Sequence, residues 1–502
     1  MTTAHDLLEE PILSWRDAQG RRDCATLPRI LAKLATGELV DFPRARAHQR
    51  QPWCMFLTQL ATIALHRARK ADPRLTEAKW RSLLLRLTDG AHEPWCLVVD
   101  DLKRPAFLQP PVPKGGTDHW SWREHPDDID ILVTAKGHDV KKSLIAPDDV
   151  EAWTFALVTL QTMQGYPGRG YGRIARMNGG YGNRPCIALA TDLTLTARFT
   201  RDVQVLRDSW DDLVDKRGFN SDGLALVWMA PWSGKSSLSI AELAPHFIEI
   251  CWRVRCRAAG VRGLTCAYTT TSTRRCLAGI DDGDAGDPWV PIERDKGALT
   301  VGRGGFRYEL LVRLLFSGDF EPAAAQLPRP DDGDPMEFLA SAMARGQGKT
   351  EGLHERVLPL TGAVRRLLGQ PETRAALGRR ASDNVQRSKD MGARVLFPAI
   401  KTLVSGQRSM PDEFDLRVDE IFFDHLFATL EQADAAARLA WDRRLHDIAW
   451  AQLQRGIGRC CITSARRYRA IADAEGVYRG CLNKHFPTLV ASLKRRTQGV
   501  AS

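Results

Sequence analysis

The sequence predicts an α+β protein with an irregular mixed α/β N-terminal body, residues 1–369, and a C-terminal four-helix bundle, residues 370–502. Three observations support this division. The 502 residues exceed the length at which a single hydrophobic core stops growing. Short β-type runs alternate with glycine- and proline-rich connections between residues 100 and 335. Beyond residue 370, glycine and proline become rare and helical patterns with charged faces take over.

The N-terminal body begins with residues 25–100, which predict mainly helices. Its apolar segment "WCMFLTQLATIALHRARK" ends in a basic turn just before Asp72-Pro73, which is a helix stop. A loop, "QLPRPDDGDP", precedes the run from Met336 to Ala344, which we expect to be helical. Four β-type runs lie between these parts: "IDILVTA" (129–135), "PCIALAT" (185–191), "HFIEICWRVRC" (246–256) and "PWVPIER" (288–294).

The C-terminal region follows "LLGQPET" (367–373), where a glycine and a proline mark a boundary. One helical stripe predicts an amphipathic helix, and it consists of Phe414, Val418, Ile421, Phe422, Leu426 and Leu430. The next segment repeats the pattern with Trp441, Leu445 and Ile448. Expected breaks at Gly406, near Asp434, at Gly456 and at Gly476 leave four helices, enough for an antiparallel bundle.

The charge balance is moderately basic. There are 71 Lys and Arg against 61 Asp and Glu, a net charge of +10, and arginine predominates. Arginine suits bidentate contacts to phosphate, so this charge permits nucleic-acid binding without proving it. The start of the chain has no apolar core of the signal-peptide type, and no apolar run approaches the roughly 20 residues that span a bilayer. We therefore expect a cytoplasmic protein.

The cysteines do not predict a metal site. Cys251, Cys256, Cys266 and Cys276 form the one cluster, and their spacing matches no zinc template. We expect them to be buried, reduced thiols, and we expect neither a metal nor another cofactor.

The segment "ARGQGKTEGLHER" (344–356) raises the question of a nucleotide site, because Gly348-Lys349-Thr350 ends like a phosphate-binding loop. The first glycine of that motif is replaced by Met343, and the run before it does not read as a strand. The other interpretation is a tight turn at Gly346 and Gly348 that directs Gln347 and Lys349 outward.

Two glycine clusters, "GYPGRGYGR" (165–173) and "NGGYGNRP" (178–185), lack the frame of a dinucleotide-binding fingerprint. They are either flexible loops or a surface on which the backbone approaches a ligand. Arginines interleaved with the glycines favour the second interpretation, since they can bind phosphates or enter a minor groove. These arginines are Arg169, Arg173, Arg176 and Arg184.

The segment "DIDILVTAKGHDVKKS" (128–143) is too particular to be generic. It resembles a segment of the large subunit of the type I-E CRISPR surveillance complex Cascade, the CasA family. Further blocks are similar to that family in the same order along residues 5 to 360. They are "EEPILSW", "GYPGRGYGR", "NRPCIAL", "GDPWVPI", "RGGFRYELLVRLLF" and "RGQGKTEGLHER".

The resemblance implies a protein that is not an enzyme. It implies an α/β body joined to a four-helix bundle, bound to the crRNA-bearing Cascade subunits and to the crRNA 5′ end. Such a subunit recognises the protospacer-adjacent motif (PAM) of double-stranded target DNA through the minor groove. It then wedges the strands apart to start the R-loop and helps to recruit a trans-acting helicase–nuclease in antiviral defence.

The resemblance also assigns residues. A glycine loop falls on Gly168, Arg169, Gly170 and Gly172, and a minor-groove finger on Arg274 or Arg275, which replace the family's lysine. A wedge falls on Gly346, Gln347, Gly348, Lys349 and Thr350, where the inserted tip is Gln347, Lys349 or Thr350. The anchoring loop, Asp130 to Lys142, contributes Lys136, His138, Lys141 and Lys142 to crRNA and complex contacts.

Two other functions compete with this one. The first is an ATP-dependent nucleic-acid enzyme that uses the Gly348-Lys349-Thr350 loop, and the second is a basic scaffold that only binds partners. Basic residues of the bundle either hold DNA or form a solvated helix face. They are Arg379, Arg380, Arg387 and Lys389.

Overall fold

The computed structural model describes residues 3–113, 116–136, 142–168, 172–260, 263–403, 410–459 and 464–499. The chain folds as two compact units. The N-terminal unit comprises Met1–Phe306 and Phe320–Thr361, and the C-terminal unit comprises Arg307–Asp319 and Gly362–Ser502. The C-terminal unit therefore includes one segment from within the expected body, Arg307–Asp319. Its second segment begins at Gly362, eight residues before position 370.

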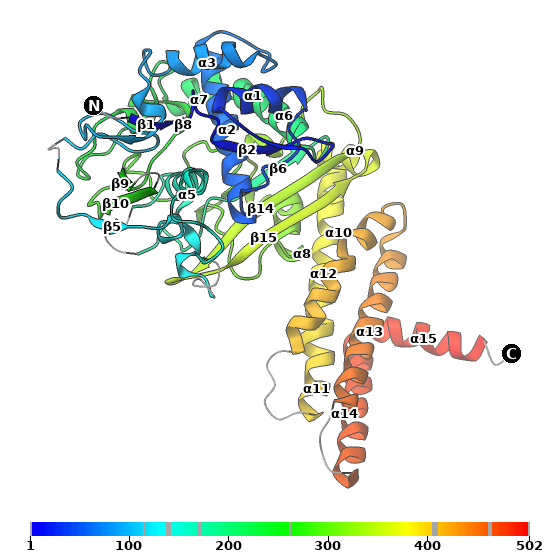
Figure 1. The fold of residues 1–502 in the computed structure, drawn as a ribbon. Coiled ribbons are helices and arrows are strands. Elements are labelled where there is room, and N and C mark those ends of the chain that lie inside the picture. Colours follow the sequence, from blue (N-terminus) through cyan, green and yellow to red (C-terminus); the bar gives the residue numbers. More distant parts are fainter. Residues whose placement is uncertain are drawn as a thin grey trace. The chain divides into compact units, whose positions relative to one another are not determined.

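The N-terminal unit is built around a buried helix, α2 (Figure 1). Its segment is apolar on nearly all sides, which is typical of a helix inside a core. Trp53 stacks on Phe56 with 5.4 Å between the ring centroids and meets Phe155 edge-on at 5.3 Å. The expectation of helices over residues 25–100 is confirmed. The helices of this unit are α1 (Leu27–Thr36), α2 (Ala47–Arg67), α3 (Glu77–Arg86), α5 (Val150–Met163), α6 (Leu195–Asp208) and α7 (Trp210–Arg217).

The strands of the N-terminal unit form several small sheets. They are β1 (Thr3–Asp6), β2 (Leu13–Arg16), β3 (Arg22–Ala25), β4 (Cys96–Val99), β5 (Ser121–Arg123), β6 (Cys186–Ala190), β7 (Leu224–Leu226), β8 (Leu243–Ile248), β9 (Arg253–Ala259), β10 (Gly263–Thr269), β11 (Ile292–Glu293), β12 (Gly297–Ala298), β13 (Phe320–Glu321), β14 (Met336–Gly346) and β15 (Lys349–Leu360). Three-stranded sheets have the orders β5-β10-β9, β12-β11-β13 and β15-β14-β6. Two-stranded pairs are β1-β4, β2-β3 and β7-β8.

The β-type runs of the sequence are confirmed except for the first. "IDILVTA" is not a strand, because it forms a short 3-10 turn, Ile131–Thr134, after Asp130. The Asp130 carboxylate accepts a hydrogen bond from the Leu132 amide at 2.9 Å, and this local bond competes with strand pairing.

The longest hairpin joins β14 and β15 (Figure 1). The expectation of a helix from Met336 to Ala344 is wrong, although alanine and methionine favour helices locally. This stretch pairs with β15 on one side and with β6 on the other, so its backbone bonds are satisfied between strands. Burial between two neighbours overrides the weak local preference.

The C-terminal unit is helical, as expected. Its helices are α8 (Tyr308–Val312), α9 (Gly362–Gly369), α10 (Pro371–Asp390), α11 (Phe397–Leu403), α12 (Met410–Ala428), α13 (Asp434–Gly458), α14 (Ser464–His485) and α15 (Pro487–Gly499). A π-helical turn, Met391–Leu396, joins α10 to α11. Two expected breaks are wrong, since Gly456 and Gly476 lie inside α13 and α14. Gly406 lies outside the described residues.

The core of this unit follows the predicted stripe. Phe422 stacks on Tyr308 at 4.8 Å and meets Trp441 edge-on at 5.5 Å. Phe414, Val418, Leu426 and Leu445 are also buried. The 3.6-residue period therefore identified the buried face of α12 correctly.

The cysteine cluster is buried, as predicted. Cys251, Cys256, Cys266 and Cys276 are free thiols with at most 2% of their surface exposed. Cys256 and Cys266 lie opposite each other on β9 and β10. Burial raises the pKa of the Cys251 and Cys276 thiols well above the usual value, so both stay protonated.

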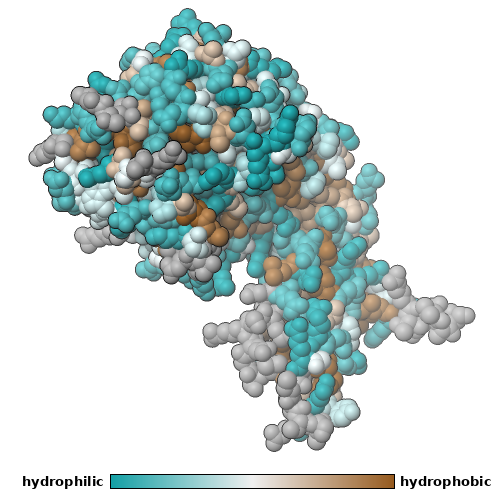
Figure 2. Space-filling view, viewed as in Figure 1, coloured by the Kyte–Doolittle hydropathy of each residue, from teal (hydrophilic) through white to brown (hydrophobic). Residues whose placement is uncertain are grey.

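The visible surface is mostly hydrophilic (Figure 2). Within the described ranges, no helix combines the length and the apolar character needed to cross a membrane.

Candidate nucleic-acid interface

A cleft of about 700 Å³ brings together two segments that the sequence assigned to DNA binding. The first holds Gly168, Gly172 and Arg173, and the second runs through Thr273 and Arg274. About a hundred residues separate them in the sequence. The remaining lining residues are Tyr166, Gly179, Thr271, Ser272, Ala278 and Asp281.

The glycine side of the cleft is tightly constrained. A side chain at Gly172 would place its Cβ 1.7 Å from the Cys251 carbonyl oxygen, so only glycine fits there. Gly168 has a φ of 147°, which a residue with a Cβ rarely adopts. Arg169 and Gly170, which were also assigned to this loop, lie outside the described residues.

Positive charge on the cleft is incompletely neutralised. Arg173 and Arg274 each donate a 3.0 Å hydrogen bond to the same oxygen of Asp281. The Asp281 side chain is 80% exposed. Burial and the charge of Arg173 lower the pKa of Arg274, yet an arginine remains protonated near neutral pH. Two guanidinium groups thus share one exposed carboxylate, although the Arg274 side chain itself is only 8% exposed.

The second finger candidate lies elsewhere. Arg275 is buried with 3% of its surface exposed, and its guanidinium contacts the Ala230 carbonyl oxygen at 3.4 Å. It also lies 5.9 Å from the centre of the Trp232 ring. Arg274, not Arg275, lines the cleft.

Two arginines of the glycine-rich region have a structural role, so the hypothesis that they contact phosphate is wrong. Arg176 and Arg184 are each 2% exposed. Arg176 pairs with Glu249 at 2.9 Å, and Arg184 pairs with Asp287 at 2.7 Å. These buried pairs fix the path of the chain just after Gly172.

The same network positions the cleft wall. Glu249 accepts the Ala175 amide at 2.8 Å while it binds Arg176. The carboxylate therefore ties the chain three residues after Gly172 to the end of β8. Breaking a buried charge pair of this kind is costly, because the remaining charge has no partner.

The predicted wedge is the turn of the β14–β15 hairpin. Gly346 pairs with Lys349, which leaves Gln347 and Gly348 as the two turn residues. Gly348 has a φ of 68°, the conformation that glycine favours in tight turns. The tight-turn interpretation of this segment is therefore correct.

The three candidate tip residues differ in their contacts. Lys349 pairs with Glu351 at 2.8 Å. The Thr350 hydroxyl lies 2.8 Å from the Ile131 carbonyl oxygen and 2.9 Å from the Thr134 hydroxyl. Gln347 is exposed at the turn. Only Gln347 combines the turn position with a side chain that makes no hydrogen bond or ion pair in this part of the described chain.

This geometry does not form a phosphate-binding loop. Such a loop leads from a strand into a helix, whose first amides bind the phosphates. Here the glycines connect two antiparallel strands, and Lys349-Thr350 begins β15. The nucleotide-site interpretation therefore has no structural support.

The anchoring loop is described at its two ends only. Lys136 is exposed. Lys142 pairs with Asp128 at 2.7 Å, which draws the two ends together. His138 and Lys141 lie outside the described residues.

Basic residues of the bundle mostly have acidic partners. Arg380 contacts Asp434 at 2.6 Å, Arg387 contacts Asp442 at 2.5 Å, and Lys389 contacts Glu309 at 3.1 Å. Arg379 is exposed. At Arg380, Arg387 and Lys389, these pairs favour a solvated helix face over a DNA surface.

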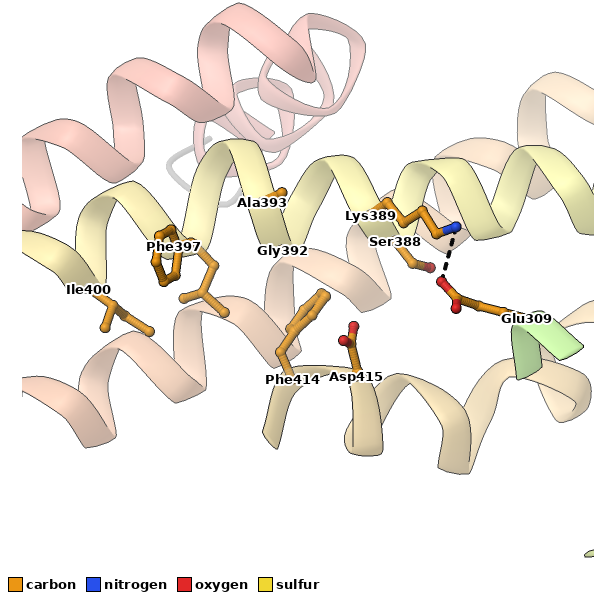
Figure 3. Close-up of a pocket in the computed structure, with 10 residues that line it drawn as sticks. Glu309, Ser388, Lys389, Gly392, Ala393, Phe397, Ile400, Phe414 and Asp415 are labelled. Atoms are coloured by element: carbon orange, nitrogen blue, oxygen red, sulfur yellow. Dashed lines mark ion pairs between the residues drawn. The ribbon is translucent and has the colours of Figure 1, made fainter. Parts of the chain in front are cut away.

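A second cavity, of about 350 Å³, lies within the C-terminal unit (Figure 3). Apolar side chains, including Phe397, Ile400 and Phe414, line one end, and the Glu309–Lys389 ion pair lies at the other. A Cβ at Gly392 would lie 3.2 Å from the Phe414 ring, so the glycine lets this ring pack closely against the π-helical turn. The cavity lacks the excess positive charge of the cleft.

Several cleft residues were not foreseen from the sequence. Tyr166 lies 5.6 Å from the Arg173 guanidinium, and Asp281 holds the two arginines together. Thr271, Ser272 and Thr273 add hydroxyl groups to the same wall. The sequence offered one signal for these residues, the hydroxyl-rich run beside the predicted finger. Asp281 could not be found in this way, because it reaches the cleft only in the folded chain.

No protein-family model and no curated protein matches the sequence. Solved structures do match over nearly the whole length. CasA (Cse1) of Thermus thermophilus is 14% identical, with 95% of this chain and 100% of that chain covered and a TM-score of 0.62. Cse1 of Acidimicrobium ferrooxidans is 15% identical, with 96% and 98% covered and a TM-score of 0.62.

A chain of a CRISPR RNA-guided surveillance complex also matches, at 14% identity and a TM-score of 0.57, with 95% of this chain and 100% of that chain covered. Both units of the present chain are included in alignments of this extent. The chain therefore has the fold of the CasA (Cse1) proteins.

Proposed function

We propose that this chain is the PAM-recognising large subunit of a crRNA-guided type I-E Cascade complex. The observation that carries the proposal is the cleft in which Gly168, Gly172, Arg173 and Arg274 meet. The shared fold and the match to a chain of a surveillance complex support the same role. Its partners are then the crRNA-bearing subunits, the crRNA 5′ end, PAM-containing duplex DNA and a helicase–nuclease.

The cleft has the chemistry that minor-groove binding requires. Backbone at Gly168 and Gly172 can approach the DNA closely because no side chain intervenes. Arg274 supplies a cation. On binding DNA, its guanidinium leaves the Asp281 carboxylate and lies in the negative potential of the minor groove. The minor groove presents a degenerate pattern, so a reader of this kind tolerates more than one PAM.

The hairpin supplies the wedge. Gln347 extends from a two-residue turn, and its amide can hydrogen-bond to an unpaired base edge. Opening a base step costs a few kcal/mol, which the inserted side chain offsets by filling the gap. Guide pairing then carries the sequence specificity, and the protein reads only the short PAM. No catalytic group is needed for this role.

The test uses the complete complex assembled on a guide RNA, with Arg274→Ala in the large subunit. Removal of one groove contact should weaken binding of a PAM-bearing duplex by about tenfold. Binding is measured by titration at several salt concentrations, and a duplex without the PAM serves as reference. The variant should lose selectivity for the PAM as well as affinity.

The matched control is Arg86→Ala, since Arg86 is an exposed arginine on α3. It should leave PAM binding unchanged. The proposal is wrong if no guide-containing complex forms, or if the wild-type complex binds both duplexes equally at every salt concentration.

A further inference from the structure

Thr350 joins the hairpin turn to the 3-10 turn Ile131–Thr134. Its hydroxyl donates to the Ile131 carbonyl oxygen at 2.8 Å and lies 2.9 Å from the Thr134 hydroxyl. More than two hundred residues separate these segments in sequence. In Figure 1, the turn end of β14–β15 lies beside the cyan segment that contains this turn.

The outer end of the hairpin needs such support. β6 pairs with β14 only from Glu337 to Ser341, so the strands beyond Ser341 form a two-stranded ribbon. Ala342, Met343 and Ala344 are still buried, but Gln347, Gly348 and Lys349 at the turn are exposed. Isolated two-stranded ribbons are marginally stable in water, so the turn end gains from a further contact. The register also shifts between Ala344 and Arg345, which breaks the regular ladder just before the turn.

The 3-10 turn is in contrast firmly held. The buried Asp130 carboxylate lies 2.7 Å from His48 Nε2 and accepts a 2.8 Å hydrogen bond from Gln49 Nε2. Both residues belong to the first turn of α2. Burial acts to raise the pKa of Asp130, but the charges of His48 and Arg46 outweigh it and lower this pKa to about 2. The turn is thus fixed to the N-terminal end of α2, a largely buried helix of the unit.

The same turn is the first part of the anchoring loop. Lys136 lies two residues after Thr134. The pKa of Glu351 on β15 is lowered by its hydrogen bond to Lys349 and, further, by charges that include Lys136. Lys142 returns the loop to Asp128, two residues before Asp130. The loop base and the hairpin end therefore share one support.

We propose that Thr350 and Thr134 are positioning residues that aim Gln347 for strand separation and couple it to the Lys142–Asp128 pair. This inference rests on the proposed function, and it names the regulation of the same site. While the Thr350 junction is intact, the 3-10 turn holds the ribbon end in one orientation. When the junction is broken, the hairpin remains folded but its tip samples several orientations.

The experiment compares Thr350→Val with Thr350→Ser in the assembled, guide-bearing complex. Valine keeps the shape and removes the hydroxyl, whereas serine keeps the hydroxyl. A 2-aminopurine probe in the first base pairs beside the PAM reports strand opening. We expect opening to be about fivefold slower with valine and close to wild type with serine, as the loss of one hydrogen bond predicts.

Two further measurements separate positioning from general damage. Affinity for a duplex whose first base pairs are already mismatched should be unchanged in Thr350→Val, because such a duplex needs no wedge. Thr36→Val is the matched control, since the Thr36 hydroxyl donates to the Ala32 carbonyl oxygen within α1. It should open DNA at the wild-type rate.

Coupling is tested by combining Thr350→Val with Lys142→Met, which removes the pair that closes the loop base. Each single change should slow opening, and the double variant should be no slower than the slower single variant. If the double variant slowed strand opening by the product of the two single factors, the coupling would be overturned. Equal opening by wild type and Thr350→Val would overturn the positioning role, whereas failure of the wild type to open PAM-bearing DNA would overturn the proposed function itself.

Discussion

Single residues decide the shape of the proposed DNA-binding cleft. Gly172 lies against the Cys251 carbonyl, and Glu249 holds the chain three residues further on. Arg173 and Arg274 are held toward the opening by Asp281, whose carboxylate is exposed. A constrained backbone and two arginines that share one carboxylate thus line the same cleft.

The backbone constraint leads to a prediction for Gly172→Ala. The new methyl group would overlap the Cys251 carbonyl, so the wall must shift at a cost of about 2–3 kcal/mol. Urea unfolding should show this loss of stability, and PAM binding by the assembled complex should weaken with it.

The control is Gly279→Ala, at an exposed glycine in the neighbouring loop with open space where a Cβ would stand. It should leave both stability and binding unchanged. Unaltered stability of Gly172→Ala would show that the close approach of the Cys251 carbonyl does not constrain this wall in solution.

At the scale of elements, the 3-10 turn Ile131–Thr134 depends on the charge of Asp130. The folded-state pKa of about 2 lies below the ordinary value of 3.8. A lowered carboxyl pKa contributes stability that is fully present above pH 4 and is lost as the pH falls toward 2. The shift corresponds to about 2.5 kcal/mol.

We therefore predict that Asp130→Asn destabilises the protein at pH 7 and that its difference from wild type narrows between pH 4 and pH 2. Urea unfolding across this range measures the effect. Asp128→Asn is the control. The Asp128–Lys142 pair is partly exposed, and exposed pairs contribute little to the free energy of unfolding. If the difference in unfolding free energy between wild type and Asp130→Asn did not change with pH, Asp130 would not be a stabilising carboxylate with a lowered pKa.

Element type was predictable where one pattern persisted over many residues. The stripe of α12 and the apolar run of α2 both gave helices, as predicted. The stretch Met336–Gly346 was mispredicted because its residues favour a helix in isolation, and its strand form depends on partners at β6 and β15. Gly476 did not end α14, since packing tolerates a glycine inside a long helix.

At the scale of the whole molecule, the net charge of +10 lies almost wholly in the C-terminal unit, which carries 26 Lys and Arg against 17 Asp and Glu. Many arginines are already paired with carboxylates, as Arg387 is with Asp442. The N-terminal unit, which contains the cleft, is close to neutral, so the positive charge that the cleft can offer to DNA is small. In the proposed function, strong binding comes from the assembly, in which guide pairing adds its own free energy.

The isolated chain should accordingly bind DNA weakly and with little preference for the PAM. Its affinity should fall steeply between about 50 and 200 mM salt, because the contacts that remain are to phosphates. Fluorescence anisotropy with PAM-bearing and PAM-free duplexes measures this. Tight, salt-resistant and PAM-selective binding by the chain alone would contradict the idea that guide pairing supplies most of the affinity.

The sequence by itself determined the α+β class, the helical C-terminal region, the buried thiols and the tight turn around Gly348. Each of these follows from local periodicity, local composition or the conformational freedom of glycine. The tertiary structure decided which charges remain available. Arg176, Arg184, Arg275 and Arg274 have the same chemistry and all four are largely buried, but only the fold places Arg274 in the lining of the cleft. It also brought Thr350 to Thr134, because contacts between distant segments are set by packing, which no local pattern encodes.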